Sequence, residues 1–309
     1  MIAEATPGRP PGAPVGRELL AADLGSLGLR RGQDLLIQCS LRQIGPVEGG
    51  AAALLDALLD VAGRRATLVV PTYTTLNSLT SRDFHAAVAG LDGNQRARFV
   101  AAMPGFDPSR TPSHGMGTFA EHLRTRPSAV RSHHPQASFA ALGRQARACT
   151  SIHDLDCHLG DRSPLGWLYA VDAAVLLLGV GYSVCTAFHL AEYHLPRPLP
   201  VQEYHCFTAE EGGRVERTFN AVALDDSDFA QLGAGLEAIS PAALRQGRVG
   251  SGTGRVISLR AAVDFGVTWL TIHRRRPCPE KPLSSCPYSQ PVLIMVPVPM
   301  GREGAGGRL

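Results

Sequence analysis

The chain of 309 residues is almost without lysine, since Lys281 is the only one and arginine carries nearly all of the positive charge. Lys and Arg together number 30 against 27 acidic residues, a formal net charge of +3, and only 18% of the chain is charged. So small a positive excess does not indicate a nucleic-acid-binding protein. With abundant Ala, Gly and Pro, the arginine bias is typical of a GC-rich genome rather than of a binding function.

Long apolar runs and a secretory signal are also missing. No apolar stretch approaches the roughly 20 residues that span a bilayer. The first sixteen residues are rich in Pro and Gly and lack both the basic and the apolar region of a signal peptide. The seven cysteines are odd in number and form no CxxC pair, which favours reduced thiols over a disulfide framework. We therefore expect a cytoplasmic protein that does not enter the membrane.

What is present is the pattern of an α/β protein. Residues 34–39, 66–71 and 175–178 are short apolar runs typical of buried strands, and residues 51–61 form a strongly patterned helix between the first two. Strand, glycine-rich turn, helix and strand follow the order of a parallel sheet. Residues 203–208 and 214–223 alternate like antiparallel strands around a glycine turn. The sequence therefore predicts a mixed sheet or an added β-hairpin.

The domain boundaries follow from shifts in composition. We expect a disordered leader over residues 1–16, one domain over 17–276, and a mostly helical insertion at 76–103. From Arg274 onward come three arginines, dense Pro and two Cys, so residues 277–309 are predicted to be a tail outside the core.

Residues 174–196, AVLLLGVGYSVCTAFHLAEYHLP, organise the rest of the chain. A buried strand ends in Gly179-Val180-Gly181, and a helix follows that carries Thr186, His189 and Glu192 on one face. Open α/β sheets place their chemistry beyond the carboxyl ends of such strands. An imidazole with a pKa near 6.5 accepts a proton at neutral pH, so His189 is a candidate general base. From spacing alone, an ordinary helix histidine is an equal alternative.

A metal site is the rival interpretation of the same region. Histidine and cysteine gather along this part of the chain, as His153, Cys157, His158, Cys185 and His189. Their spacing matches no standard zinc motif, and we predict no metal.

Eight segments occur in a particular order: DLLIQCSLR, IGPVEGG, TLVVPTYT, FDPSRTPSHGMG, RSHHPQASFAALG, GDRSPLG, VLLLGVGYSVCTAFHLAEY and LDDSDF. This order resembles the aminoglycoside 3-N-acetyltransferases, which are unrelated in fold to the GNAT enzymes, over roughly Glu18 to Thr271. The resemblance implies a single mixed-sheet α/β domain that uses acetyl-coenzyme A to acetylate the 3-amino group of a 2-deoxystreptamine aminoglycoside, and so confers antibiotic resistance. The implied partners are these two small molecules, with the protein a monomer or homodimer.

The resemblance also implies roles for individual residues. His189 would be the base, with Thr186 and Glu192 beside it, although an acid from elsewhere in the fold remains an alternative partner. The implied coenzyme A contacts are Cys39, Ser40, Leu41, Arg42, Val47, Gly49, His134 and Ser138. The implied substrate contacts are Tyr73, Asp107, Asp225, Asp226 and Asp228. For any single aspartate, a helix cap or a solvated first turn is nearly as good an interpretation. Direct transfer in the family and an apolar setting argue against Cys39 as a covalent acyl carrier.

The chain departs from the family pattern in three places. It has Cys39 where members usually carry Ser or Thr, and Gln38 where they usually carry His. The insertion is longer than in many members. Residues 277–309 have no counterpart, which fits either a distinct tail or an altered reading frame. Two alternatives follow: an acetyltransferase for another amine in antibiotic metabolism, or a catalytically silent coenzyme A-binding protein. The intact Thr186, His189 and Glu192 argue against the silent protein.

Overall fold

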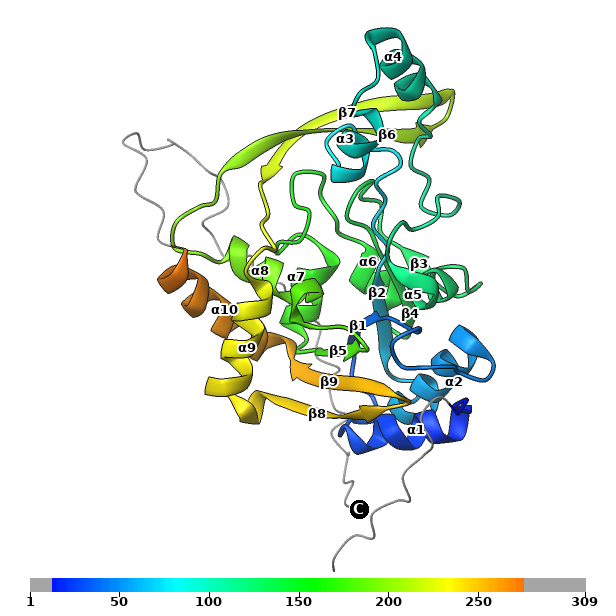
Figure 1. Ribbon diagram of the computed structural model, residues 1–309, viewed down its shortest axis with the longest axis vertical. Helices are drawn as coiled ribbons and strands as arrows, with labels where there is room; N and C mark the ends of the chain where they lie inside the picture. Colours follow the sequence, from blue (N-terminus) through cyan, green and yellow to red (C-terminus); the bar gives the residue numbers. More distant parts are fainter. Residues whose placement is uncertain (1–12, 275–309) are drawn as a thin grey trace, which may run out of the picture. The chain divides into compact units, whose positions relative to one another are not determined.

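The computed structural model describes residues 13–274, which belong to one compact unit (Figure 1). Within these residues a seven-stranded sheet has the order β3-β4-β2-β1-β5-β9-β8. Its strands are β1 (Leu35–Cys39), β2 (Thr67–Pro71), β3 (Val130–Arg131), β4 (Phe139–Gly143), β5 (Ala174–Leu178), β8 (Leu244–Val249) and β9 (Gly252–Ser258). The mixed-sheet α/β fold expected from the sequence is confirmed.

The central strands β2, β1 and β5 are parallel, with Leu36 opposite Val69 on one side and Val175 on the other. The strands outside them, β4 with β3 and β9 with β8, run antiparallel. Because parallel strands end at the same edge, the segments that follow Cys39, Pro71 and Leu178 emerge side by side. This edge is where the sequence places the chemistry.

Helices cover both faces of the sheet. Alternate residues of a strand point to opposite faces, so Leu35 and Ile37 pack with one group of helices and Leu36 with the other. The first group is α1 (Arg17–Ser26), α2 (Gly50–Ala62) and α5 (Gly117–Arg124). The second is α6 (Ala146–Thr150), α7 (Pro164–Ala170), α8 (Ala187–Tyr193), α9 (Phe229–Ile239) and α10 (Leu259–His273). Each fully buried leucine contributes about 1.5–3 kcal/mol, so this sandwich fixes the strand ends firmly.

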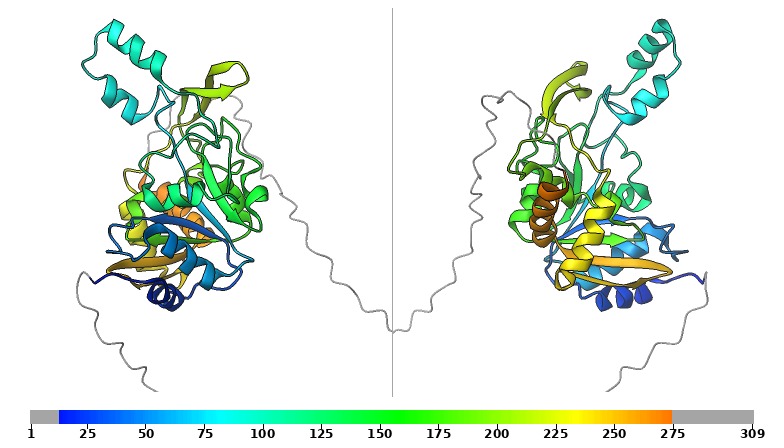
Figure 2. Two further views of the ribbon diagram at one scale, coloured as in Figure 1. Left: turned by 90° about the vertical axis from the view of Figure 1, so that its right-hand side faces the viewer. Right: turned by 60° about the vertical axis from the view of Figure 1, so that its left-hand side comes forward.

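A separate two-stranded hairpin, β6 (Val201–Glu210) with β7 (Gly213–Val222), lies beyond the edge where the central strands end. The insertion contributes α3 (Arg82–Val88) and α4 (Gly93–Ala102), which project beside the hairpin in Figure 2. A small apolar cluster of Phe84, Met103 and Phe207 joins the insertion to the hairpin. The insertion thus stands over the same edge of the sheet as the hairpin.

The predicted domain boundaries fall near the limits of the described residues. Val15 lies inside the predicted leader, yet it is fully buried and its N–H donates to the Pro46 carbonyl at 2.9 Å, so it belongs to the folded body. The predicted tail, 277–309, lies outside the described residues, as do residues 1–12. No helix within 13–274 is both long and apolar enough to cross a membrane.

Candidate active site

The segment after β5 carries the proposed base. Gly179 turns the chain with a φ of 63°, and a Cβ there would lie 2.7 Å from Cβ of Gln43 and 2.9 Å from the Ser40 carbonyl oxygen. Only glycine fits both the positive φ and the close approach of the loop after β1. A short 3₁₀ turn (Tyr182–Val184) follows and leads into α8. The glycine therefore sets where α8 begins relative to β1.

His189 and Glu192 form a pair on α8. His189 Nδ1 lies 2.6 Å from Oε2 of Glu192, and the two side chains are 16% and 0% exposed. A carboxylate at this distance accepts the hydrogen bond, so Nδ1 carries the proton and Nε2 is the basic nitrogen. The Phe229 ring packs edge-on against the imidazole, with centroids 4.7 Å apart. The sequence pairing of His189 with Glu192 is thus present as a direct, largely buried contact.

The other oxygen of Glu192 faces the opposite way. Oε1 accepts hydrogen bonds from the Arg274 guanidinium and, at 3.0 Å, from the Asp225 backbone N–H. Arg274 Nε also donates to Oδ2 of Asp228 at 2.6 Å. Burial alone would lower the pKa of Arg274, but its bonds to Asp228 and Glu192 outweigh burial and raise the pKa. Arg274, which sequence composition assigned to the end of the domain, is thus part of the site.

The three aspartates predicted to bind substrate lie between β7 and α9, and the structure brings two of them, Asp225 and Asp228, beside Glu192. Asp228 bonds Arg274, and Asp225 Oδ1 accepts a hydrogen bond from the Ser227 N–H. Asp226 reaches toward the insertion, where its Oδ1 lies 3.4 Å from the Arg82 guanidinium. The Asp226 and Arg82 side chains are 44% and 88% exposed. Of these contacts, the one between Asp226 and Arg82 is open to solvent.

Gln38, at the end of β1, fastens the loop before α8. Its Oε1 accepts from the Thr186 N–H at 2.9 Å, and its Nε2 donates to the Val184 carbonyl. Thr186 is buried one turn before His189. Tyr73 follows β2 and has a buried hydroxyl; burial raises the pKa of Tyr73, and the Thr186 hydroxyl partly offsets this effect. Tyr73, which follows β2, and Thr186, which follows β5, thus meet beside the end of β1, one turn of α8 before His189.

The predicted coenzyme strip follows β1 and leads into α2. Burial raises the pKa of the Cys39 thiol to about 12, which disfavours a thiolate there. Ser40 hydrogen-bonds through its backbone to Leu178, Leu41 and Val47 are partly buried, and Arg42 is exposed. Gly49 begins α2 at a φ of 78°, where no side chain caps the helix and no acidic residue lies in the first turn. Such an uncapped helix start favours an anion.

His134 and Ser138, also assigned to coenzyme A, are fully buried with internal partners. His134 Nδ1 accepts from the backbone N–H groups of Gln136 and Ala137, each at 3.1 Å, and Nε2 lies 3.1 Å from the Leu155 carbonyl. The Ser138 hydroxyl donates to the Thr72 carbonyl at 2.9 Å. These hydrogen bonds hold the loop that leads into β4, and the coenzyme role of the two residues stays a prediction.

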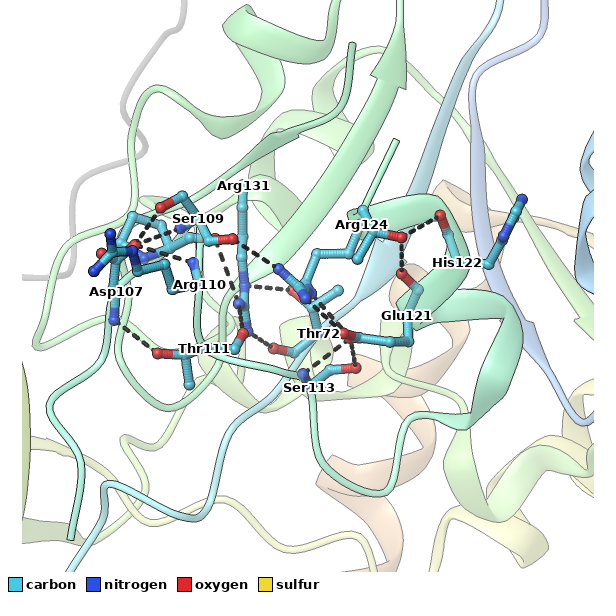
Figure 3. Close-up of polar contacts among 12 residues, drawn as sticks. Thr72, Asp107, Ser109, Arg110, Thr111, Ser113, Glu121, His122, Arg124 and Arg131 are labelled. Atoms are coloured by element: carbon cyan, nitrogen blue, oxygen red, sulfur yellow. Dashed lines mark hydrogen bonds and ion pairs between the residues drawn. The ribbon is translucent and has the colours of Figure 1, made fainter. Parts of the chain in front are cut away.

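Asp107, predicted to bind substrate, lies in a loop with many polar contacts (Figure 3). Its Oδ1 accepts from the Ser109 hydroxyl at 2.6 Å and the Ser109 N–H at 2.7 Å, which lowers the pKa of Asp107. Arg131 crosses beneath this loop and donates to the Thr72 carbonyl at 2.6 Å and to the Thr111 carbonyl. Arg131 therefore ties the Asp107 loop to the residue that precedes Tyr73.

Three histidines pack against one another with tilted rings. His134 packs against His153 and His158 with centroids 4.6 Å apart in both pairs, and His158 packs on Tyr204 at 4.4 Å. Burial lowers the pKa of His134 to about 4 and those of His153 and His158 well below the ordinary value. Within residues 13–274 no group of three or more His, Cys, Asp or Glu side chains is arranged to hold a metal ion. The three imidazoles act here as neutral packing and hydrogen-bonding groups.

Comparison with known proteins gives this arrangement a family. The sequence model of the aminoglycoside 3-N-acetyltransferases matches residues 36–271, from β1 to the last turns of α10. The chain belongs to the aminoglycoside 3-N-acetyltransferase family. Aminoglycoside N(3)-acetyltransferase VII of Streptomyces paromomycinus is 36% identical over 270 residues, which cover 83% of this chain and 92% of the relative. Enzymes of this name are acyltransferases that transfer an acetyl group.

Solved structures of similar proteins agree with this placement. The crystal structure of YokD from Bacillus subtilis superposes with a TM-score of 0.79 at 32% identity, covering 86% of this chain and 97% of YokD. AAC-IIIb, solved as a binary complex with CoASH, gives a TM-score of 0.73 at 28% identity and covers 86% of this chain and all of AAC-IIIb. AAC-VIa, solved with sisomicin, gives 0.71 at 28% identity, with coverages of 84% and 98%. The chain therefore has the acetyltransferase fold of this family along its described length.

The sequence analysis named the residues at the centre of this candidate site but did not anticipate two side chains that contact them, Gln38 and Arg274. Thr186, His189, Glu192, Tyr73 and the acidic turn come together as expected. Gln38 was noted only as a departure from the family pattern, although its position at the end of a central strand could have indicated that it contacts the site. Arg274 gave no signal of its own, because the first of three consecutive arginines at a change of composition has no periodicity to distinguish it.

Proposed function

We propose that this chain transfers the acetyl group of acetyl-coenzyme A to the 3-amino group of a 2-deoxystreptamine aminoglycoside, with His189 as general base. The observation that carries the proposal is the buried His189–Glu192 pair at the end of the central strands. The pair leaves Nε2 as the basic nitrogen on the partly exposed side of the imidazole. Membership of the aminoglycoside 3-N-acetyltransferase family supplies the class of reaction.

The reaction needs a proton acceptor at one point. As the amine nitrogen attacks the thioester carbonyl carbon, its proton passes to Nε2 of His189. The C–S bond then breaks, the acetyl group remains on nitrogen as an amide, and the departing thiolate takes the proton from the imidazolium. Glu192, 2.6 Å from Nδ1, stabilises the imidazolium while it exists. General-base assistance of this kind contributes roughly a hundred- to ten-thousand-fold.

Thr186 and Tyr73 are the proposed neighbours of the reacting carbonyl. Both present a hydroxyl group beside the first turn of α8, and Gln38 fixes the Thr186 backbone. A donor that meets the negative charge developing on the carbonyl oxygen lowers the barrier in the transition state more than in the ground state. We assign this role to Thr186, with Tyr73 as its support.

Coenzyme A is the proposed occupant of the strip from Cys39 to Gly49. The start of α2 offers backbone N–H groups without a side-chain cap, and Arg42 adds an exposed positive charge nearby in sequence. Both features suit a phosphate. The structure of AAC-IIIb with CoASH, which shares the fold, supports a coenzyme A site in this chain. His134 and Ser138 would act on that site through the loop they hold.

The acidic turn is the proposed recognition site for a polycationic substrate. Asp226 is open to solvent, and its ion pair with Arg82 is exposed. A charged hydrogen bond from an aminoglycoside amine would be worth about 1.5–3 kcal/mol where it is partly buried. Asp107 and Asp225 are the further acids proposed on this side, and sisomicin bound to AAC-VIa supports an aminoglycoside as the substrate class.

A thiol-release assay with acetyl-coenzyme A and a panel of aminoglycosides tests this function. We expect thiol release with compounds that carry a free 3-amino group on 2-deoxystreptamine, and none when that amine is blocked. Release only with other amines would favour the second candidate, an acetyltransferase of antibiotic metabolism, for which the long insertion over the site is the favouring observation. Coenzyme A binding without release for any amine would overturn both.

A further inference from the structure

Arg274 is the last described residue, and it caps the carboxyl end of α10. Its side chain is only 11% exposed and turns back into the site. The guanidinium donates to Oε1 of Glu192, to both carboxylate oxygens of Asp228 and to the Asp225 carbonyl. One side chain thus gathers α8, α10 and the acidic turn at a single point.

Glu192 needs such a partner. Its side chain is 0% exposed, and a buried carboxylate without a compensating charge is strongly disfavoured. Its two oxygens are divided between neighbours: Oε2 faces Nδ1 of His189, while Oε1 faces Arg274 and the Asp225 N–H. Because the carboxylate is planar and rigid, a donor that fixes Oε1 also fixes the direction of Oε2.

Arg274 is itself held in place. The Asp228 carboxylate receives two of its donors, Nε at 2.6 Å and one terminal nitrogen, in the side-on geometry that sets the plane of a guanidinium. The Phe229 ring lies below it, with the guanidinium carbon 5.9 Å from the ring centroid. The same ring packs against His189. Arg274 therefore reaches the base both through Glu192 and across one aromatic ring.

We propose that Arg274 is a positioning residue for the base, which holds Oε1 of Glu192 so that Oε2 stays directed at Nδ1 of His189. The inference rests on the proposed role of His189. It also assigns the Asp228 carboxylate to the support of Arg274 rather than to the substrate, which leaves Asp226 as the solvent-open acid of the turn.

The test uses the full chain with Arg274→Gln and, as a matched control, Arg260→Gln on the same helix. Arg260 bonds the carbonyl oxygens of Tyr169 and Ala170, at the opposite end of α10 from Arg274. We expect Arg274→Gln to lower kcat at least tenfold with little change in KM for acetyl-coenzyme A. Arg260→Gln should stay within about twofold of the parent kcat.

Two further measurements distinguish a role of Arg274 in positioning His189 from a role in fold stability alone. The proton NMR resonance of the His189 Nδ1–H, which a short bond to a carboxylate shifts downfield, should move or broaden in Arg274→Gln. In the His189→Ala background, Arg274→Gln should cause no further loss of the remaining rate, because residues that act as a unit are not additive. Thermal unfolding of each variant gives the folded fraction.

An unchanged kcat and an unmoved Nδ1–H resonance in folded Arg274→Gln would overturn the inference, as would an equal loss in the His189→Ala background. If Arg274→Gln does not fold, Arg274→Lys is judged by the same criteria, since it keeps the charge but loses the side-on contact. Near-parent turnover of His189→Ala alone would instead remove the proposed base. That result is distinct from a failure of the Arg274 inference.

Discussion

Acid should destabilise this protein well before its carboxylates are protonated, because three buried histidines must stay neutral in the fold. Burial lowers the pKa of His134 to about 4 and lowers those of His153 and His158 well below the ordinary value. Above pH 6.5 both the folded and the unfolded chain hold these imidazoles neutral, and stability is complete. As the pH falls below 6.5, these histidines bind protons in the unfolded chain but not in the folded chain, so the free energy of unfolding decreases.

The size of the effect follows from this difference in pKa. At pH 5 a histidine with a pKa of 6.5 when unfolded and about 4 when folded loses about 2 kcal/mol of stability. His134 alone would thus lose about 2 kcal/mol of a typical total of roughly 5–15 kcal/mol, and the lowered pKa values of His153 and His158 add to this loss in the same direction. Urea unfolding at 25 °C between pH 7.5 and pH 5 should therefore show a steep fall in the free energy of unfolding.

One variant isolates the contribution of a single imidazole. His158→Phe keeps a ring against Tyr204 but loses the 2.8 Å contact with Oε1 of Gln136, so it should be less stable at every pH. Its loss of stability between pH 7 and pH 5 should nevertheless be smaller than that of the parent, because burial lowers the pKa of the His158 imidazole that the variant lacks. The control is His205→Gln. The contact with Glu203 raises the pKa of His205, so this histidine stabilises the fold at low pH and its contribution is lost as the pH rises, opposite to the effect of His158. A His158→Phe curve parallel to the parent over this range would refute the reasoning.

Three further predictions concern the supports of the site. Gln38→Leu should cost about 1–3 kcal/mol of stability and lower kcat, because two backbone groups before α8 lose their partners; unchanged urea unfolding and turnover would contradict this. Arg131→Met should cost about 3 kcal/mol, while Arg110→Met, at an exposed position in the Asp107 loop, should cost little; equal unfolding midpoints would contradict the role of Arg131. Asp226→Asn should raise KM for aminoglycosides and Arg82→Ala should lower it, both more at low salt, and salt-independent values would exclude the electrostatic role.

The central part of the fold was predictable because its signals are local. Apolar runs marked β1, β2 and β5, and a periodic pattern marked α2, within one or two residues of their observed bounds. The hairpin of β8 and β9 was missed. Its segments, LRQGRV and GTGRVIS, are rich in Gly and Arg, which have little strand preference, and they pair because β9 lies against β5. Pairing of this kind depends on the tertiary context and leaves little trace in the sequence.

The contacts of the candidate site also divide into local ones, which the sequence predicts, and long-range ones, which it does not. His189 and Glu192 are three residues apart on one helix, so their contact follows from helix geometry. Arg274 is 82 residues from Glu192, and Gln38 is 148 residues from Thr186, so neither contact has a periodicity to reveal it. Asp107 and Asp228 could be nominated as charged residues, but their internal bonds to Ser109 and Arg274 appear only in three dimensions.

The role of His189 as base is tested most directly by turnover of His189→Ala beside His194→Ala. His194 caps the same helix and makes a 2.8 Å contact with Asp161, so it is a second histidine–carboxylate pair that lies outside the proposed machinery. Thiol release should fall at least about a hundredfold in His189→Ala, with coenzyme A binding retained, and change little in His194→Ala. Near-parent turnover of a folded His189→Ala protein would contradict the account.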